Sequence, residues 1–306
     1  MIAVLGSLNM DFVVRAERLP APGETILGHT FQTLPGGKGA NQACAAGKLA
    51  APGAAVRMIG CTGYDIFGDQ LRASLSAAGV DVSAVRSTRS APTGIAMIWV
   101  DSAGQNSIIV APGSNHALHA RDAESFRPAF RGARHALFQL ETPLDTVEAA
   151  MRIASSEGAQ VILDPAPAQP LPASLLARVS ILTPNEGEAL TLLGRSASRV
   201  SLDEAPELAA ALLSLGPRAV ILKLGDHGCF YRDSAKSRHA PAFRVDAVDT
   251  TAAGDTFNAA LAVALSEECA IEDALRFANA AAAISVTRPG AQTSAPSRSE
   301  VDALLI

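Results

Sequence analysis

The sequence predicts an α/β protein: a doubly wound, mostly parallel central sheet flanked by helices, with a small β-sheet lid. The first observation is a series of short apolar runs, each bounded by Gly, Pro or Asp. They are Ile2–Leu5, Val56–Ile59, His135–Leu140, Gln160–Leu163, Ile181–Leu182 and Ala219–Leu224. Continuous apolar runs of this length are typical of strands that are covered on both faces.

The second observation is that helical stretches separate these runs. The stretches are Asn41–Leu49, Gly68–Ala78, Leu144–Ser156, Leu202–Leu215, Gly254–Leu265 and Ile271–Val286. Strand and helix therefore alternate along most of the chain. Such alternation indicates parallel strands joined by helical crossovers, which is the doubly wound arrangement.

Two regions depart from this alternation. Residues 11–34 carry short β-like runs without a helix, and residues 93–111 contain the runs Gly94–Val100 and Asn106–Ala111 around a turn. A pair of short runs joined by a Gly-containing turn is typical of a hairpin. We expect these two regions to form the lid over one edge of the site, within a single domain that spans residues 1–306.

Composition excludes several classes of function. Of 306 residues, 48% are hydrophobic and 18% charged, which is enough apolar material for a large core. The net charge of −5 comes without a basic cluster, so we expect no nucleic-acid partner. No uncharged stretch of about 18 apolar residues suggests a membrane span, and the first residues lack the basic region of a signal peptide.

The four cysteines also favour a simple interpretation. Cys44, Cys61, Cys229 and Cys269 are scattered and form no CxxC pair. Zinc binding and disulfide exchange are therefore not indicated. Free thiols are typical of a reducing compartment, so we expect a cytoplasmic protein.

Polar residues follow several predicted strands at the point where each strand ends. They are Asn9, Asp11, Glu141, Asp164, Thr183, Asn185, Glu186 and Asp226, the last preceded by Gly225. Ligands of open α/β sheets bind beyond the carboxyl ends of the strands, where several polar groups converge. Each residue alone has a structural alternative, because turns and helix N-caps favour the same residue types.

A glycine-rich segment, Gly36-Gly37-Lys38-Gly39-Ala40-Asn41, precedes the first predicted helix. It is not a Walker loop, because Gly39 stands where that motif needs Ser or Thr. Its glycine spacing also differs from that of a dinucleotide-binding fingerprint. The segment is either a tight turn or a place where a ligand approaches bare backbone, with Asn41 offering both a donor and an acceptor.

The strongest local pattern lies at residues 248–257, where small residues lead directly into an apolar helix. The first N–H groups of a helix lack partners, and the helix dipole adds positive potential there. The small Ala252, Ala253 and Gly254 would leave these N–H groups open to an anion. Asp255 would then stand beside the anion as a base, or would be a simple N-cap.

Four segments together resemble the ribokinase/PfkB family of carbohydrate kinases. They are residues 6–11 (GSLNMD), 36–43 (GGKGANQA), 183–188 (TPNEGE) and 249–258 (DTTAAGDTFN). The resemblance extends in register from Ile2 to about Leu304. The glycine-rich segment alone is a weak signal, whereas the four segments in this order are highly specific.

The resemblance implies roles for individual residues. The sugar would be bound by Asn9, Asp11, Gly37, Lys38, Gly39, Ala40, Asn41, Glu141 and Asp255. Asp255 would be the catalytic base, and the amides of Ala252, Ala253 and Gly254 would stabilise the transferring phosphoryl group. The nucleotide would be bound by Asn185, Lys223, Gly225, Asp226, Gly228, Gly254 and Asn279.

The resemblance also implies two metal ions. Glu188, with Asn185, would hold water-bound Mg²⁺ beside the phosphates of ATP. A K⁺ activator would lie near Asp249, Thr251, Ser285, Arg288, Gly290 and Ser294, mostly on backbone carbonyls. The alternative for this second set is that Asp249 caps a turn and Arg288 neutralises it.

Three positions bear on specificity. Lys223 stands where the family commonly has Thr, and Asn279 where it has His, so details of nucleotide recognition are in question. Lys223 could contact a phosphate or could simply be solvated. Met10 lies between two sugar-binding positions and would either favour a less hydroxylated sugar or serve as packing.

The sequence therefore predicts ATP-dependent phosphorylation of D-ribose at its 5-hydroxyl, by a homodimer that pairs through the lids. The nearest alternative is the same chemistry on 2-deoxyribose, another sugar or a nucleoside. A nucleoside is disfavoured because aromatic residues make up only 4% of the chain. A non-catalytic sugar-binding protein is a further alternative, although a pure binder would need neither Asp255 nor the small residues before it.

Overall fold

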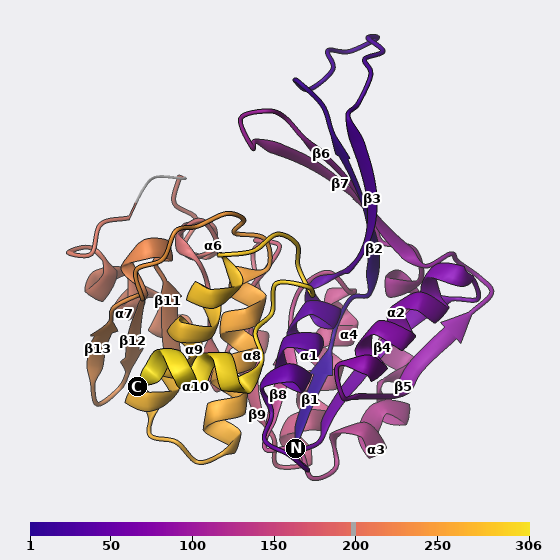
Figure 1. The fold of residues 1–306 in the computed structure, drawn as a ribbon. Helices are drawn as coiled ribbons and strands as arrows, with labels where there is room; N and C mark the ends of the chain where they lie inside the picture. Colours follow the sequence, from indigo (N-terminus) through magenta and orange to yellow (C-terminus); the bar gives the residue numbers. More distant parts are fainter. Residues whose placement is uncertain (197–199) are drawn as a thin grey trace.

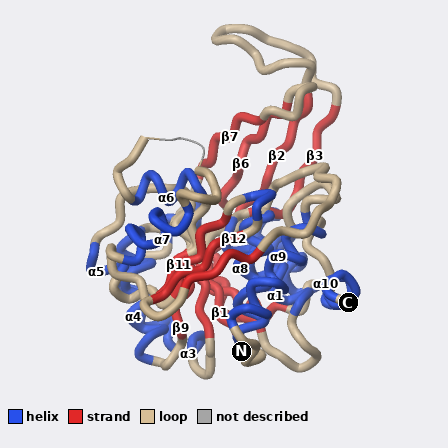
Figure 2. The backbone as a smooth tube through the Cα atoms, turned by 90° about the vertical axis from the view of Figure 1, so that its left-hand side faces the viewer, coloured by secondary structure: helices blue, strands red, loops and turns tan. Residues whose placement is uncertain are grey.

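The computed structural model describes residues 1–196 and 200–306, and within them it confirms the predicted fold class. The main sheet has the order β13-β12-β11-β10-β9-β8-β1-β4-β5 (Figures 1 and 2). Its strands are β1 (Ile2–Leu5), β4 (Val56–Gly63), β5 (Val80–Thr88), β8 (His135–Phe138), β9 (Gln160–Leu163), β10 (Ile181–Leu182), β11 (Ala219–Lys223), β12 (Cys229–Asp233) and β13 (Ser237–Ala240). All pairs from β5 to β11 are parallel, whereas β12 and β13 pair antiparallel.

Helices cover both faces of this sheet (Figure 1). One face carries α1 (Lys38–Leu49), α2 (Ile66–Ala77), α8 (Ala253–Ser266), α9 (Ile271–Ser285) and α10 (Arg298–Leu305). The other carries α3 (Arg127–Phe130), α4 (Leu144–Ser156), α5 (Ala173–Leu176), α6 (Glu186–Leu192) and α7 (Ala205–Leu213). Two separate cores result, one on each side of the sheet.

Strand β1 shows why the strands are apolar throughout. Ile2 and Val4 point into one core, and Ala3 and Leu5 point into the other. Successive side chains of a strand alternate between faces, so burial on both faces requires an apolar residue at every position. The continuous apolar runs of the sequence therefore mark the centre of the sheet.

A second, four-stranded sheet projects from the body (Figures 1 and 2). Its order is β3-β2-β6-β7, built from β3 (Thr30–Gly36), β2 (Asn9–Arg15), β6 (Gly94–Val100) and β7 (Asn106–Ala111). The hairpin predicted at residues 94–111 is formed by β6 and β7, which pair antiparallel. Three short 3₁₀ helices complete the described elements: η1 (Gly113–Ala117), η2 (Ala120–Phe126) and η3 (Gly225–His227).

Several elements differ from the sequence-based boundaries. Helix α1 begins at Lys38 rather than at Asn41, because Gly37 takes a left-handed φ of 89° at the N-cap and turns the chain into the helix. Strand β5 was not predicted, since this edge strand is only partly buried and lacks a continuous apolar run. Among the described residues, no helix has the length and apolarity needed to cross a membrane.

Candidate active site

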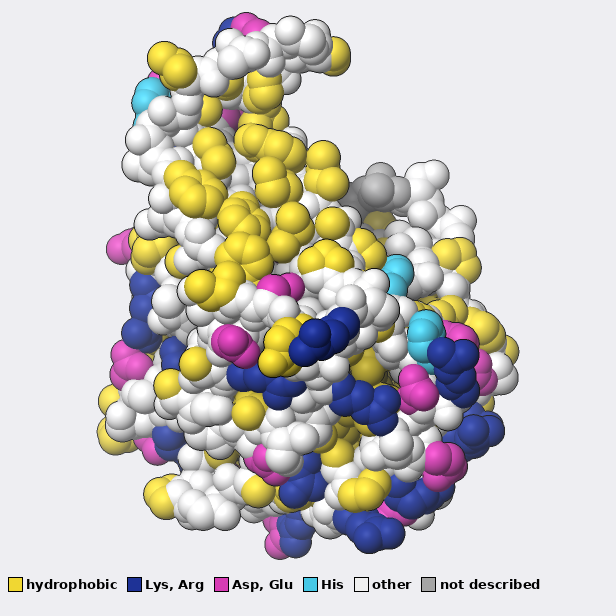
Figure 3. All heavy atoms as spheres, turned by 90° about the vertical axis from the view of Figure 1, so that its right-hand side faces the viewer, with side chains coloured by type: hydrophobic (Ala, Val, Ile, Leu, Met, Phe, Trp, Pro, Cys, Tyr) yellow, Lys and Arg dark blue, Asp and Glu magenta, His cyan; other side chains and the backbone are white. Residues whose placement is uncertain are grey.

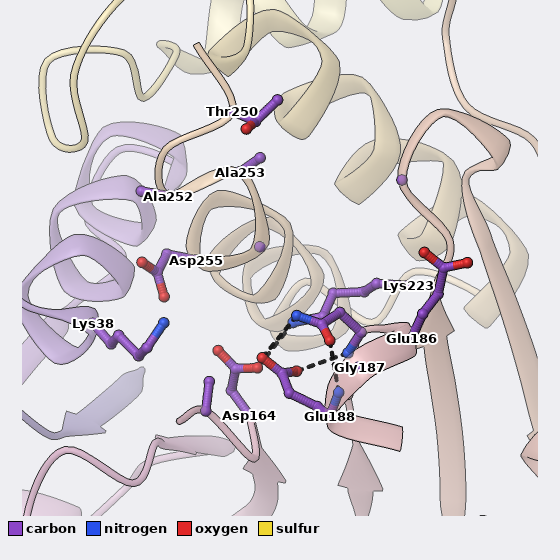
Figure 4. A pocket seen from close by; sticks show the side chains of 14 residues that line it. Lys38, Asp164, Glu186, Gly187, Glu188, Lys223, Thr250, Ala252, Ala253 and Asp255 are labelled. Carbon is purple, nitrogen blue, oxygen red and sulfur yellow. Dashed lines mark hydrogen bonds and ion pairs between the residues drawn. The ribbon is translucent and has the colours of Figure 1, made fainter. Parts of the chain in front are cut away.

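A cavity of about 440 Å³ lies beyond the carboxyl ends of β9, β10 and β11. Because these strands are parallel, the polar residues that follow them meet at one edge. The lining residues are Lys38, Asp164, Ala166, Asn185, Glu186, Gly187, Glu188, Lys223, Gly225, Thr250, Ala252, Ala253, Gly254 and Asp255 (Figure 4). Residues from distant parts of the chain thus surround one space.

The mouth of helix α8 forms one wall of this cavity. Ala252 is its N-cap and takes a left-handed φ of 57°, which is uncommon outside glycine and bends the chain into the helix. The N–H of Ala253 donates to the Thr250 carbonyl at 3.2 Å. Among the described residues, the N–H groups of Ala252 and Gly254 have no acceptor, so they remain open toward an anion.

Asp255 lies in the first turn of α8 and is almost fully buried. Its Oδ2 accepts from Asn41 Nδ2 at 3.1 Å, and its Oδ1 accepts from Gln42 Nε2 at 3.0 Å. Burial raises the pKa of Asp255 to about 6, while the Lys38 ammonium lowers it, Asp164 raises it further, and the two amides lower it. A carboxylate with such a pKa is largely ionised at pH 7 and can accept a proton.

Gln42 joins Asp255 to a second carboxylate. Its Nε2 also donates to Asp164 Oδ2 at 3.1 Å, and its Oε1 accepts from Gln139 Nε2 at 2.6 Å. Gln139 thereby fixes the orientation of the Gln42 amide, so that the NH₂ group faces both carboxylates. The other Asp164 oxygen accepts from Lys223 Nζ at 2.9 Å.

Glu141 organises the end of the site nearest β1. Its Oε2 accepts from Ser7 Oγ at 2.5 Å, from the backbone N–H of Lys38 at 3.2 Å and from Asn9 Nδ2 at 3.5 Å. Asn115 Nδ2 donates to Asn9 Oδ1 at 2.7 Å, which fixes the Asn9 amide with its NH₂ toward Glu141. Each amide and carboxylate then keeps further hydrogen-bonding capacity for a polyol.

Asp11 lies over Gly36, where a β-carbon would come within 2.1 Å of its Oδ2. Burial raises the pKa of Asp11 to about 7, and the charges of Glu141 and Asp255 act in the same direction. Asn41 Oδ1 is buried without a partner among the described residues. Asp11, Asn41 and Glu141 therefore present oxygen atoms that can accept hydrogen bonds from hydroxyl groups.

A larger cavity of about 690 Å³ adjoins the first and shares Gly225, Thr250 and Ala253 with it. Its walls are mainly apolar and include Ala242, Phe243, Val245, Ala282, Ala283 and Val286. Asn279 lines it as well, and its Nδ2 donates to the carbonyls of Ala240 and Pro241 at 3.0 and 3.1 Å. An apolar hollow beside a helix mouth with open N–H groups suits the base of a nucleotide.

Comparison with known proteins agrees with this geometry. Residues 1–298 match the family described as pfkB family carbohydrate kinase. The chain belongs to the pfkB family of carbohydrate kinases. A ribokinase of Haemophilus influenzae is 42% identical over 98% of this chain and 96% of its own length. A deoxyribokinase of Salmonella typhi is 34% identical over 97% of this chain and 95% of its own length.

A solved structure shares the whole architecture of this pfkB kinase. The structure of Arabidopsis thaliana ribokinase complexed with ribose and ATP has a TM-score of 0.89 and 37% sequence identity. The similarity covers 99% of this chain and 98% of that one. Both the nine-stranded sheet and the small sheet therefore belong to the ribokinase fold, as the sequence predicted.

Not every predicted site residue of the kinase reaches a cavity. Gly39 packs against Gly6, where a β-carbon would come within 2.6 Å of backbone, and the N–H of Ala40 donates to the Ser7 carbonyl. Gly228 has a φ of 86° in the turn between β11 and β12 and abuts the Ala240 carbonyl. These three positions favour close packing rather than ligand contact.

The residues expected to hold Mg²⁺ do line the central cavity. Asn185 caps α6, its Oδ1 accepts from the N–H of Glu188 at 2.8 Å, and both Glu188 oxygens accept from Asn185. Burial raises the pKa of Glu188, whereas the Lys223 ammonium lowers it. In the described part of the chain, no three His, Cys, Asp or Glu side chains gather as a metal site. An Mg²⁺ here would need water and phosphate oxygens as its remaining ligands.

The residues expected near K⁺ lie on two adjoining loops and, for Ser285, at the last position of α9. Asp249 connects them, since its Oδ1 accepts from the N–H of Thr251 and its Oδ2 from the N–H of Gly290, both at 2.9 Å. Ser285 and Ser294 are buried and donate to carbonyls of their own turns. Arg288 bonds Glu300 at 2.9 Å rather than Asp249, which contradicts the alternative that Arg288 neutralises Asp249.

Four residues of this hydrogen-bond network were not assigned from the sequence: Ser7, Gln42, Asn115 and Gln139. Gln42 directly follows the glycine-rich segment and could have been found there, because a Gln buried beside a predicted site needs polar partners. Asn115 gives no local signal, since it meets Asn9 across 106 positions of sequence. Asp164 was noted at a strand end, but its ion pair with Lys223 joins residues 59 positions apart.

Proposed function

We propose that this pfkB kinase transfers the γ-phosphoryl group of ATP to the 5-hydroxyl of D-ribose, with Asp255 as general base. The observation that carries the proposal is the position of Asp255. This carboxylate is buried in the cavity wall, one residue after the open N–H of Gly254, and is bonded to Asn41 of the sugar end. The base and the proposed anion site therefore border one cavity, and the proposed polyol acceptors adjoin it through the Asn41–Asp255 hydrogen bond.

In the proposed step, the sugar hydroxyl attacks the γ-phosphorus and gives up its proton as the new bond forms. As the 5-hydroxyl oxygen approaches the γ-phosphorus, its proton passes to Asp255. The new oxygen–phosphorus bond forms while the bond to the β–γ bridging oxygen breaks, and ADP leaves with that electron pair. A carboxylate base suffices because phosphoryl transfer has a loose transition state that needs little early proton removal.

The open N–H groups of Ala252 and Gly254 would stabilise the negative charge on the transferring group. Lys38 would add a cation from α1 beside Asp255 (Figure 4). Burial lowers the pKa of Lys38, but the charges of Asp255, Asp164 and Glu141 raise it above its usual value. Lys38 is therefore charged throughout the physiological range.

We further propose that Glu188 and Asn185 hold Mg²⁺ with the help of the nucleotide phosphates. Their oxygen donors fit a hard cation that keeps several water ligands. When bound, Mg²⁺ would neutralise phosphate charge.

A K⁺ ion near Asp249 would order the loop that presents the open N–H groups. The support for K⁺ is that Asp249 already bonds both loops of the predicted set.

We propose that the small sheet is a lid that closes over the sugar. Its strand β2 carries Asn9 and Asp11, so closure would bring these residues onto the hydroxyl groups and exclude water. The sheet also presents exposed apolar side chains, among them Phe31 at 60% and Ile109 at 62% exposure (Figure 3). Together with the open edges of β3 and β7, these support pairing of two lids in a homodimer.

The cysteines support a reducing compartment, in line with the proposed cytoplasmic location. All four are free thiols, and Cys44, Cys61 and Cys229 are buried.

Met10 is buried in the core on the face of β2 opposite Asn9 and Asp11. This position supports a packing role for Met10 and gives no support to a preference for 2-deoxyribose.

The decisive experiment is a panel of ribose, 2-deoxyribose, hexoses and nucleosides, each assayed with ATP and Mg²⁺ by ADP release and by mass spectrometry of the product. We expect ribose to have the highest kcat/KM and to yield ribose 5-phosphate. A higher kcat/KM for another acceptor would replace ribose as the substrate. Ribose binding without ADP formation from any acceptor would show a sugar-binding protein instead.

A further inference from the structure

Lys223 lies at the point where the main sheet, helix α6 and the cavity meet. It is the last residue of β11, its backbone N–H donates to the Pro184 carbonyl at 2.8 Å, and it forms a parallel bridge with Asn185. Its side chain is 13% exposed and lines the central cavity (Figure 4). The backbone is therefore fixed, and the side chain reaches from the sheet into the space expected for the phosphates.

The ammonium group of Lys223 faces the mouth of α8. A β-carbon added at Gly254 would stand 3.3 Å from Lys223 Nζ, with no nearer heavy atom. Gly254 carries an N–H group at this helix mouth that has no backbone acceptor among the described residues. An anion docked on that N–H would therefore lie within reach of the ammonium group as well.

Asp164 holds the side chain in this direction. Its Oδ1 accepts from Lys223 Nζ at 2.9 Å, and its Oδ2 is fixed by Gln42 at 3.1 Å. An ammonium group has three donors, so the bond to Asp164 leaves two for another acceptor. Asp164 thus fixes the position of the Lys223 ammonium group and leaves two of its N–H donors available to a ligand.

The charges around the cavity give this cation a function. Three carboxylates, Asp164, Glu188 and Asp255, face the two ammonium groups of Lys38 and Lys223 (Figure 4). Burial lowers the pKa of Lys223, but Asp164 and Glu188 raise it above its usual value, so the group stays charged. Without this cation, the phosphates of a nucleotide would meet a wall that is predominantly acidic.

A purely structural ion pair is the competing explanation. Such a pair would hold Asp164 in place and would need no contact with a ligand. Two features distinguish Lys223 from that case: its side chain borders an open cavity, and Asp164 is already bonded by Gln42 on its other oxygen. If Lys223 served only to hold Asp164 in place, its ammonium group would not need to lie beside Gly254.

We propose that the Lys223 ammonium group binds the terminal phosphate oxygens of the nucleotide at the mouth of α8, and that Asp164 positions it there. This inference rests on the proposed function, because it assumes a nucleotide whose phosphates dock on the open N–H groups. It assigns Lys223 as a binding residue for phosphate charge, while Asp164 is a positioning residue.

The test compares ligands that differ only in phosphate. Binding of adenosine, ADP and a non-hydrolysable ATP analogue is measured by calorimetry for the wild type, Lys223→Met and Lys223→Arg. We expect Lys223→Met to weaken ADP and the ATP analogue by about 10–100-fold, since a hydrogen bond to a charged group contributes about 1.5–3 kcal/mol. Adenosine affinity should change by less than about twofold, and Lys223→Arg should restore part of the loss.

The matched control is Lys236→Met, which removes an exposed lysine paired with Glu272. If Lys223→Met is poorly folded, the double variant Lys223→Met/Asp164→Asn removes both charges and tests the same ratio. An ADP-to-adenosine affinity ratio equal to that of the wild type in a folded variant would overturn the proposal. Failure of ribose phosphorylation by the wild type is a separate outcome, because the ligand comparison needs no turnover.

Discussion

The two ends of the active site are built in different ways. The sugar end is a network of buried side chains, in which Gln139, Gln42 and Asp255 follow one another through hydrogen bonds. The nucleotide end is an apolar hollow, and its polar Asn279 bonds neighbouring backbone. The first end resists rearrangement because each polar atom depends on its neighbours, whereas the second can adjust.

This difference between the two ends predicts which ligand, the sugar or the nucleotide, the enzyme selects more strictly. A site that hydrogen-bonds hydroxyl groups discriminates strongly against ligands that lack them, since its buried polar groups are then left unpaired. An apolar hollow discriminates weakly between ligands of similar shape. We therefore expect stringent selection of the sugar and looser selection of the nucleotide base, and the following predictions challenge that contrast.

The largest effect is expected for Asp255→Asn, at the junction of the two ends. Asn cannot accept the hydroxyl proton, so kcat should fall by about 10²–10⁴-fold while ribose still binds. Steady-state kinetics and ribose calorimetry on the same preparation measure both quantities. Asp203→Asn, at an exposed loop position, is the control and should leave both unchanged. Near wild-type turnover of Asp255→Asn would remove Asp255 from the role of base.

Gln42→Met should have the next largest effect, because it cuts the network at the sugar end. Its amide lowers the pKa of Asp255, so its loss should raise that pKa above about 6. A base with a higher pKa is protonated at higher pH, so the acid limb of the kcat/KM profile should move toward neutral pH. We expect a loss of about 10–100-fold in kcat/KM at pH 6.

A pH–rate profile from pH 5 to 9 measures this shift, with rates above pH 8 as the internal reference. A uniform loss of rate at every pH would mean that Gln42 is needed for packing alone. Gln42→Asn, which keeps an amide on a shorter side chain, should lie between the wild type and Gln42→Met.

Glu141→Ala should weaken ribose binding by about 1–3 kcal/mol, or roughly 5–150-fold, because hydrogen bonds in a buried site are lost. Calorimetry with ribose measures the change, and ADP binding should stay within about twofold. Glu207→Ala, on an exposed part of α7, is the matched control. Unchanged ribose affinity in the Glu141 variant would assign this residue a structural role.

The smallest effect is expected for Asn279→Ala at the nucleotide end. Its Nδ2 donates to the carbonyls of Ala240 and Pro241, so its loss should loosen that wall. We expect the KM for ATP to rise by no more than about fivefold, with kcat unchanged. A larger rise, or a reversal of the preference between ATP and GTP, would show that the apolar hollow is as selective as the sugar end.

The fold and much of the site followed from local patterns. Runs such as Val220–Leu222 are apolar at every position because their side chains point alternately into the cores on the two faces of the sheet, and this marks them as strands. Small residues before an apolar helix predicted uncovered N–H groups at Ala252, Ala253 and Gly254; those of Ala252 and Gly254 have no backbone acceptor in the described structure, whereas that of Ala253 donates to Thr250. These features depend on neighbours in sequence, so periodicity and residue size reveal them.

Other features depend on residues that meet only after folding. The edge strand β5 has no apolar run, and Asn115 bonds Asn9 because η1 lies against the start of β2. The direction of the Lys223 side chain was left open between phosphate contact and solvent, and its bond to Asp164 fixes it. No sequence pattern carries this information, since each partner lies on a different strand or helix.

The sequence by itself determined the parallel sheet, the carboxylate at the helix mouth and the family. Tertiary structure alone decided which polar side chains bond one another, which glycines serve packing, and where the ammonium groups point. The physical reason is range: backbone conformation and burial are set by nearby residues, whereas a hydrogen bond or an ion pair requires two groups to be brought within about 3 Å by the whole fold.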